Sequence, residues 1–147
     1  MYAMLLVRSL VLIRNRYHTM TYFEEEVERI RNLIYSNQVQ LDTVIATRRY
    51  INEHYDTVLN LEVLSRELLV SKYHLLRLFK RYYGQTPQQY LSQKRIEKAK
   101  EHLREGMRVT EVCYAVGFQS LGSFSTLFKK KTGSSPHEFQ KRATFKK

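Results

Sequence analysis

Residues 71–91 read SKYHLLRLFKRYYGQTPQQYL, and residues 120–140 read SLGSFSTLFKKKTGSSPHEFQ. The two stretches align without a gap at an offset of 49 residues, and the same serine, Leu-Phe-Lys run, glycine and proline recur in both. Self-similarity of this kind predicts that one supersecondary unit is built twice in the chain.

A short apolar segment precedes each stretch, and there the offset falls to 48 residues. Four pairs of residues match at this offset: Leu61/Val109, Leu64/Val112, Ser65/Cys113 and Leu68/Val116. Their spacing predicts a short helix, and the serine that opens the next stretch can cap a second one. Each unit is therefore interpreted as a helix-turn-helix, whose second helix enters the major groove of DNA. The alternative is a pair of ordinary helical hairpins in a bundle.

Glycine and proline mark the ends of the predicted helices. Gly84, Gly106 and Gly133 each follow a helical pattern, and Pro87 and Pro136 each open the next one. No alternating strand pattern stands out, so the fold class is all-α. Helices are expected near residues 23–34, 43–55, 61–68, 71–83, 87–104, 109–116, 121–132 and 136–142. This order predicts two helix-turn-helix subdomains joined by a long connecting helix and preceded by an extra N-terminal helix.

The charge of the chain is unevenly distributed. The chain carries 25 Lys and Arg against 14 Asp and Glu, a net charge of +11. Five Arg and five acidic residues balance within residues 1–43, so the whole excess lies in residues 44–147. A small domain this basic typically binds a polyanion through its phosphates, although a basic surface can also serve solubility alone. The basic runs 80–81 and 129–131, which end the second helix of each unit, favour DNA over a plain bundle.

The sequence indicates neither an enzyme nor a metal or cofactor site. Cys113 is the single cysteine, which excludes a disulfide framework and a cysteine-based zinc site, and the five histidines are scattered. No Ser/His/Asp, paired-carboxylate or phosphate-loop arrangement stands out. The apolar run 1–13 is interrupted by Arg8 and is too short to span a membrane, so we expect a cytoplasmic protein with no membrane partner.

The residues of both units resemble a known family, the AraC/XylS-type DNA-binding domain. The run Ser71–Lys80 with Gly84, Pro87, Tyr90 and Leu91 is similar to its first half, and Arg95, Ile96 and Ala99 to its connecting helix. The run Val116–Phe118 with Phe124, Phe128–Lys130, Gly133, Pro136 and Phe139 is similar to its second half. Family members are bacterial transcription regulators, often activators. The resemblance implies sequence-specific binding of double-stranded DNA, with two reading helices in successive major grooves about 34–36 Å apart, and a contact with RNA polymerase.

The resemblance also implies which residues of the first reading helix touch DNA. They are Ser71, Lys72, Tyr73, Leu76, Arg77, Lys80 and Arg81. Arg77 is the best candidate for a bidentate contact to a guanine, because its planar fork matches O6 and N7. Tyr73 and Leu76 would pack on thymine methyl groups, whereas Lys80 and Arg81 would hold phosphates, which position the protein without reading sequence.

The second reading helix departs from the family pattern. Its contact residues by the same similarity are Ser120, Gly122, Ser125, Thr126, Lys129 and Lys130. The family often has larger side chains where this chain has Gly122, Ser123 and Thr126, which leaves the small residues Gly122, Ser125 and Thr126 facing the groove. We therefore expect the first unit to supply most of the base discrimination and the second mainly phosphate anchoring. In the turn before the first reading helix, Leu69 stands where the second unit has Gly117. That turn must either avoid a positive φ or bear strain.

Residues 1–42 are predicted to form an N-terminal appendage and residues 43–147 the DNA-binding domain. The appendage carries an apolar stripe of Phe23, Val27, Ile30 and Ile34. Such a stripe is expected to pack against its own domain or against a second copy in a homodimer. The stripe and the small residues of the second reading helix keep one alternative open. In that alternative the chain is a protein-interaction module, or an antagonist of a related regulator, with weak sequence preference.

Overall fold

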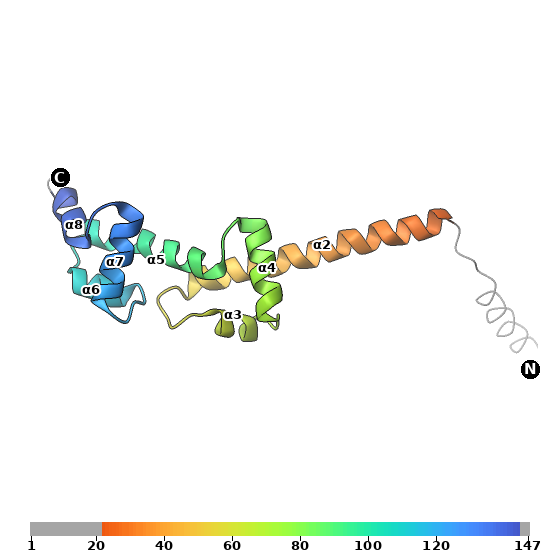
Figure 1. The fold of residues 1–147 in the computed structure, drawn as a ribbon, viewed down its shortest axis with the longest axis horizontal. Coiled ribbons are helices and arrows are strands. Elements are labelled where there is room, and N and C mark those ends of the chain that lie inside the picture. Colours follow the sequence, from red (N-terminus) through yellow and green to blue (C-terminus); the bar gives the residue numbers. More distant parts are fainter. Residues whose placement is uncertain (1–21, 145–147) are drawn as a thin grey trace, which may run out of the picture. The chain divides into compact units, whose positions relative to one another are not determined.

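The computed structural model describes residues 22–144, in which every regular element is a helix. The helices are α2 (Tyr22–Glu53), α3 (Leu61–Glu67), α4 (Lys72–Tyr83), α5 (Pro87–Arg104), α6 (Val109–Ala115), α7 (Leu121–Thr132) and α8 (Pro136–Thr144), shown in Figure 1. The all-α class is therefore confirmed. The chain divides into two units, residues 1–39 and 40–147, and α2 contributes residues to both.

The first third of the chain differs from the sequence prediction. Two helices are expected, near residues 23–34 and 43–55, whereas α2 runs without a break from Tyr22 to Glu53. The intervening segment 35–42, YSNQVQLD, contains neither glycine nor proline. Because adding a residue to an existing helix is far easier than starting a new one, nothing there stops the hydrogen-bond ladder. The extra N-terminal helix is therefore not a separate element, and the apolar run 1–13 lies outside the described residues.

Residues 40–144 contain two hydrophobic cores, one for each repeat. The first consists of Val44, Ile51, Leu59, Leu64, Leu75, Leu78, Phe79 and Leu91. The second consists of Ile96, Ala99, Leu103, Val112, Cys113, Val116, Phe124 and Phe128. Helix α5 contributes Leu91 to the first core and Ile96, Ala99 and Leu103 to the second, so the predicted connecting helix is confirmed as an element that the two subdomains share.

Equivalent positions of the two repeats make equivalent contacts. The rings of Phe79 and Tyr90 meet edge to face at a centroid distance of 5.6 Å, and those of Phe128 and Phe139 do so at 5.5 Å. Both reading helices also end as expected: Gly84 N–H donates to the Lys80 carbonyl at 2.9 Å, and its counterpart, Gly133, caps α7 in the same way. The internal repeat is therefore a repeat of tertiary contacts as well as of sequence.

The start of α5 is held by several polar contacts. Pro87 occupies its first turn, and the Thr86 hydroxyl accepts a hydrogen bond from Gln89 N–H at 3.2 Å while the Gln89 side chain accepts from Thr86 N–H at 2.8 Å. The Tyr90 hydroxyl accepts from Arg48 Nε at 3.3 Å and donates to Asn52 Oδ1 at 3.2 Å, which joins α5 to the second half of α2. Across residues 22–144, none of the helices combines the length and apolar character that crossing a bilayer requires.

Candidate nucleic-acid interface

The turn between α3 and α4 is built by local hydrogen bonds. The Asn60 side chain accepts from Val63 N–H at 2.9 Å and begins α3, and the Ser71 hydroxyl accepts from His74 N–H at 3.3 Å and begins α4. Between these caps the Ser65 hydroxyl donates to the Val70 carbonyl at 2.6 Å. The small residue that the sequence places inside the first unit therefore ties the end of α3 to the start of the reading helix.

The turn between α6 and α7 repeats the same backbone path. Val70 N–H donates to the Ser65 carbonyl at 3.0 Å, and Phe118 N–H donates to the Cys113 carbonyl at 3.0 Å. Each turn passes through the left-handed region, at φ +53° for Leu69 and +85° for Gly117. Leu69 therefore bears the strained conformation, which is one of the two outcomes expected from the sequence. Its side chain is 93% exposed and gains almost nothing from packing in return.

The expected contact residues lie on the outward face of each reading helix. In α4 the buried residues are Leu75, Leu78 and Phe79, and in α7 they are Phe124 and Phe128. The thirteen residues named above are all accessible: Ser71, Lys72, Tyr73, Arg77, Lys80, Arg81, Ser120, Gly122, Thr126, Lys129 and Lys130 are exposed, while Leu76 and Ser125 are partly buried. These last two are equivalent in the repeat and lie at the flank of the exposed face. Both helices therefore expose a largely polar and basic surface.

Two of the candidate cations in α4 have neighbours that are not expected from the sequence. Lys72 Nζ lies 3.1 Å from Glu62 Oε2 of α3, so the charge of Lys72 is partly compensated. Arg77 Nη2 lies 3.3 Å from His74 Nδ1, one turn earlier on the same helix. The spacing of three residues between His74 and Arg77 could have indicated the second contact, because such residues are neighbours on a helix surface. Tyr73, 86% exposed, lies beside this pair in the sequence.

The start of α7 contains a local polar arrangement that has no counterpart in α4. The Ser120 hydroxyl accepts from Ser123 N–H at 3.3 Å and donates to the Ser123 hydroxyl at 2.9 Å. Gly122 is the second residue of α7 and lies in its first turn, so its cost to the helix is smaller than that of a mid-helix glycine. A Cβ at this position would meet nothing within 4 Å. The last turn carries the exposed residues Lys129 and Lys130.

The two subdomains meet at Arg95, in the middle of α5. Its Nε donates to the Tyr55 carbonyl at 2.7 Å, and its Nη2 donates to the Thr57 carbonyl at 2.7 Å. Its guanidinium also lies over the ring of Phe118, 5.5 Å from the centroid. Burial lowers the pKa of Arg95, although the Asp56 carboxylate opposes that shift. Arg95 therefore connects the loop after α2, in the first subdomain, to the turn before α7, in the second. We call this contact of Arg95 with Tyr55, Thr57 and Phe118 the joint.

Gly117 is required at this joint for a reason besides its positive φ. A Cβ on Gly117 would lie 2.7 Å from the Asp56 carbonyl oxygen and 2.9 Å from Arg95 Nη2, closer than real Cβ atoms approach. A cleft of about 580 Å³ opens beside it, with Val58 and Ser120 among its lining residues. The glycine therefore lets the loop of one subdomain touch the turn of the other.

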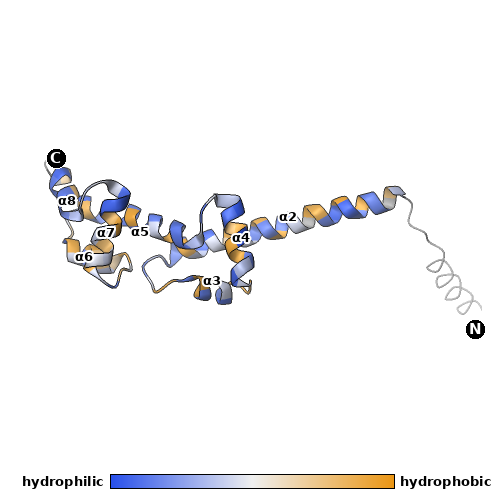
Figure 2. Ribbon diagram, in the orientation of Figure 1, coloured by the Kyte–Doolittle hydropathy of each residue, from blue (hydrophilic) through white to orange (hydrophobic). Residues whose placement is uncertain are grey.

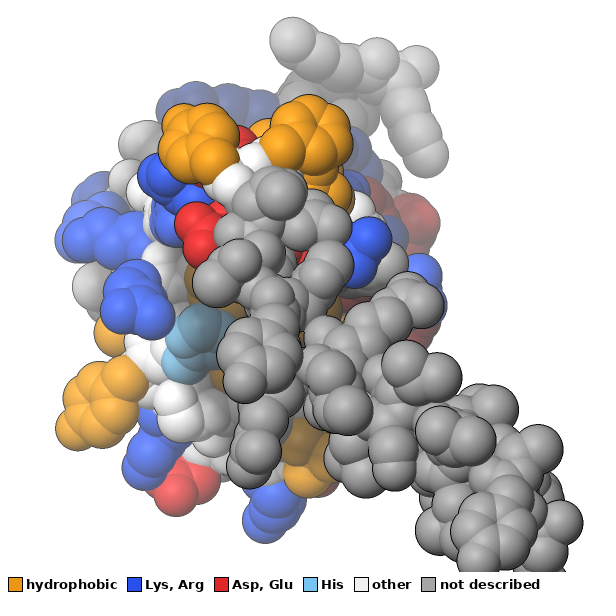
Figure 3. Space-filling model, turned by 90° about the vertical axis from the view of Figure 1, so that its right-hand side faces the viewer, with side chains coloured by type: hydrophobic (Ala, Val, Ile, Leu, Met, Phe, Trp, Pro, Cys, Tyr) orange, Lys and Arg blue, Asp and Glu red, His pale blue; other side chains and the backbone are white. Residues whose placement is uncertain are grey.

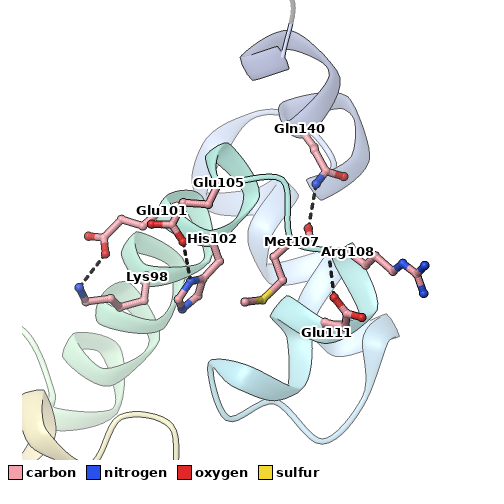
Figure 4. A network of polar contacts seen from close by, with 8 residues as sticks. All are labelled: Lys98, Glu101, His102, Glu105, Met107, Arg108, Glu111 and Gln140. Atoms are coloured by element: carbon pink, nitrogen blue, oxygen red, sulfur yellow. Dashed lines mark hydrogen bonds and ion pairs between the residues drawn. The ribbon is translucent and has the colours of Figure 1, made fainter. Parts of the chain in front are cut away.

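The far end of the second subdomain is held by a separate set of polar contacts, drawn in Figure 4. Gln140 Nε2 of α8 donates to the Met107 carbonyl at 2.8 Å, and Arg108 N–H donates to Glu111 Oε2 at 3.3 Å. On α5, Lys98 Nζ lies 2.6 Å from Glu101 Oε2. The contacts at Met107 and Arg108 hold the connection between α5 and α6, whereas the Lys98–Glu101 pair lies within α5.

Comparison with known proteins identifies relatives over the same residues. Residues 64–142 match a family model described as a helix-turn-helix domain. The chain is 36% identical over 92 residues to the bifunctional transcriptional activator/DNA repair enzyme AdaA of Bacillus subtilis. That match covers 62% of this chain but 44% of AdaA, so it spans less than half of the relative's length.

Solved structures agree with the fold. The C-terminal domain of AraT, a response regulator from Geobacillus stearothermophilus, superposes with a TM-score of 0.67 at 33% identity, covering 68% of this chain and 84% of that domain. The DNA-binding domain of AdpA, solved in complex with a target DNA, superposes with a TM-score of 0.67 at 24% identity, covering 71% of this chain and 95% of that one. At that identity the second likeness concerns the fold alone.

Proposed function

Since the chain belongs to the AraC-type helix-turn-helix family, we propose that it binds double-stranded DNA sequence-specifically in the major groove and thereby activates transcription. The observation that carries this proposal is the shared construction of α4 and α7. Each helix starts at a serine cap, buries its aromatic and aliphatic side and exposes a polar side that ends in lysine or arginine. Two such helices on a common connecting helix can engage two segments of one duplex.

Within this surface the residues of α4 divide by the kind of contact that they can make. Arg77 lies mid-helix, where a guanidinium can reach base edges, and we propose that it reads a guanine. Lys80 and Arg81 lie in the last turn, where the helix passes the backbone, and we propose that they bind phosphates. Tyr73 and Leu76 supply apolar contact area for thymine methyl groups.

We propose that α7 contributes mainly affinity. Its outward residues Gly122, Ser125 and Thr126 have short side chains or none, which can make few contacts to base edges. Lys129 and Lys130 can neutralise phosphates and release counterions. The discrimination between sequences then rests on α4, and α7 acts as an anchor.

Activation, an RNA polymerase contact and a place in the cytoplasm are parts of the same proposal. Activation is supported by the similarity to AdaA, which is a transcriptional activator. A regulator that activates transcription at a promoter works beside RNA polymerase and must share a compartment with the chromosome. A reporter gene fused to the bound promoter would test the sign of regulation, since the proposal requires expression to fall when the protein is removed.

The direct test is selection of bound sequences from a randomised pool of duplexes, followed by affinity measurements on the selected and scrambled sites. We expect the selected site to bind at least about 1,000-fold more tightly at physiological salt. Arg77→Ala should cost about 1–3 kcal/mol on the selected site and relax the preference at one base pair, with little effect on the scrambled site.

Arg81→Ala is the matched control, because it removes an arginine from the same helix at a proposed phosphate contact. This variant should weaken selected and scrambled duplexes equally. The proposal is wrong if the wild-type protein shows no sequence preference at moderate salt, or if both arginine variants affect the two duplexes alike.

A further inference from the structure

The first half of α2 exposes a continuous apolar stripe. Phe23 is 75% exposed, Val27 40%, Ile30 47% and Ile34 62%, and Leu41 farther along is 39% exposed. Hydrophobic bands recur along this part of α2 in Figure 2. Figure 3, turned by 90° from Figure 1, shows hydrophobic side chains at the surface among Lys and Arg side chains. Single apolar side chains scattered over a protein surface are common, but a contiguous stripe of large ones along one helix marks an interaction surface.

The spacing of the stripe is that of a coiled-coil seam. Successive members lie four, three and four residues apart, and the next positions in this alternation are Asn37 and Leu41. A repeat of seven residues keeps the seam on one line when two helices wind around each other with a left-handed twist. The following seam position, Val44, is buried in the core of residues 40–147. The seam available to a partner therefore runs from Phe23 to Leu41.

The charges beside the seam favour a parallel partner with the same sequence. In a parallel coiled coil with heptad positions a to g, the residue at g, just before the core position a, faces the residue at e of the other chain, which lies five places later in the sequence. Glu26 precedes Val27, and the residue five places later is Arg31, so each copy offers one acidic and one basic side chain at matching heights. Within one chain these side chains contact Arg29 at 3.5 Å and Glu28 at 3.2 Å, on the exposed surface. Such exposed ion pairs are weak and can exchange partners.

We propose that two copies of this chain pair through a parallel, in-register coiled coil formed by residues 23–41 of α2. The pair buries the apolar stripe of each helix against its own counterpart and brings Glu26 of each copy to Arg31 of the other. Pairing links two DNA-binding domains and so raises their effective concentration on a DNA that carries two sites. This inference goes beyond the proposed function, which requires only one copy.

The first test compares two valines of α2 in the full chain. Val27 lies on the seam, whereas Val39 lies off it and is 63% exposed. Val27→Glu places a charge in the buried interface and should weaken self-association by more than about 100-fold, measured by sedimentation equilibrium. Val39→Glu adds the same charge to the same helix and should associate like the wild type. Equal loss in both variants, or a wild-type chain that stays monomeric at the highest concentration, would overturn the proposal.

The second test is a charge exchange. Glu26→Arg and Arg31→Glu alone should each weaken the dimer by about twofold to fivefold, and the double variant should recover. The double variant loses both ion pairs that Glu26 and Arg31 make within one chain, because Glu28 and Arg29 then face like charges. Recovery can therefore come only from the pair between chains, and its absence contradicts the proposed register.

The third test establishes the orientation. Asn37→Cys places a thiol at a seam position near one end of the stripe, so two copies can form a disulfide under mild oxidation in the parallel arrangement alone. Cys113 is buried, and burial raises the pKa of its thiol, so it does not compete. A dimer that does not cross-link through residue 37 would exclude the parallel register. If Val27→Glu becomes monomeric but still prefers the selected DNA site, pairing and DNA reading are separate properties.

Discussion

At the scale of single residues, Leu69 and Gly117 have the same left-handed backbone conformation at equivalent positions of the two turns, although one is a leucine and the other a glycine. Both have positive φ, but the Leu69 side chain is exposed, whereas the Gly117 position is closed by the Asp56 carbonyl. An L-residue in the left-handed region costs about 1–2 kcal/mol, so Leu69→Gly should raise the free energy of unfolding. The gain should be about 0.5–1 kcal/mol, because glycine also adds entropy to the unfolded chain.

Gly117→Ala should act in the opposite direction. The alanine bears the same φ strain and in addition forces its Cβ against Asp56, so we expect a loss of about 2 kcal/mol or more. Urea unfolding followed by circular dichroism measures both variants. A stabilised Gly117→Ala, or a destabilised Leu69→Gly, would show that the two turns do not share the backbone described above.

Arg95 decides how the two subdomains are held together. Replacing it by alanine leaves the Tyr55 and Thr57 carbonyls without their charged donor and should lower the free energy of unfolding by about 2–3 kcal/mol. Because the joint spans both subdomains, affinity for the complete selected site should fall by more than affinity for a duplex that contains the α4 half alone. Gln93→Ala on the same helix is the control, since the exposed Gln93 side chain bonds to Glu97 within α5. Equal losses on both duplexes would contradict a positioning role.

At the scale of the elements, α4 and α7 share their caps and their packing but not their outward side chains. The small residues of α7 predict that Thr126→Ala changes the preference between related DNA sites by less than about twofold, since a methyl and a hydroxyl contribute little discrimination. Competition binding with selected sites that differ at single base pairs measures this preference. A large loss of discrimination in Thr126→Ala would assign base reading to α7 as well as to α4.

How far the sequence predicts the elements depends on the signals that bound them. The ends of α4 and α7 follow from Ser71, Gly84, Ser120 and Gly133, because a capping hydroxyl and a glycine act on the backbone next to them. The length of α2 was not predicted, because the polar segment 35–42 interrupts the apolar pattern without interrupting the helix. A break in the apolar pattern of a helix shows that its buried face ends there, but it does not show that the helix itself ends.

At the scale of the whole molecule, the net charge of +11 makes DNA binding dependent on salt. If Lys129 and Lys130 each neutralise a phosphate, replacing both by glutamine should reduce the slope of log affinity against log salt concentration by about 2, equally for selected and scrambled DNA. A double variant that removes two positive charges at Lys98 and Lys94 of α5 is the control for net charge alone, and its slope should change less. An equal change would mean that the basic surface acts through its total charge.

The sequence by itself determined the helical class, the repeat, the caps and the side of each reading helix that is buried. These features arise from residues a few positions apart, where periodicity and backbone preference act directly. Only the tertiary structure decided the joint at Arg95, which connects residues 38 and 40 positions apart, and the close approach that explains Gly117. No local pattern contains such contacts, because they depend on how the two cores are placed along α5.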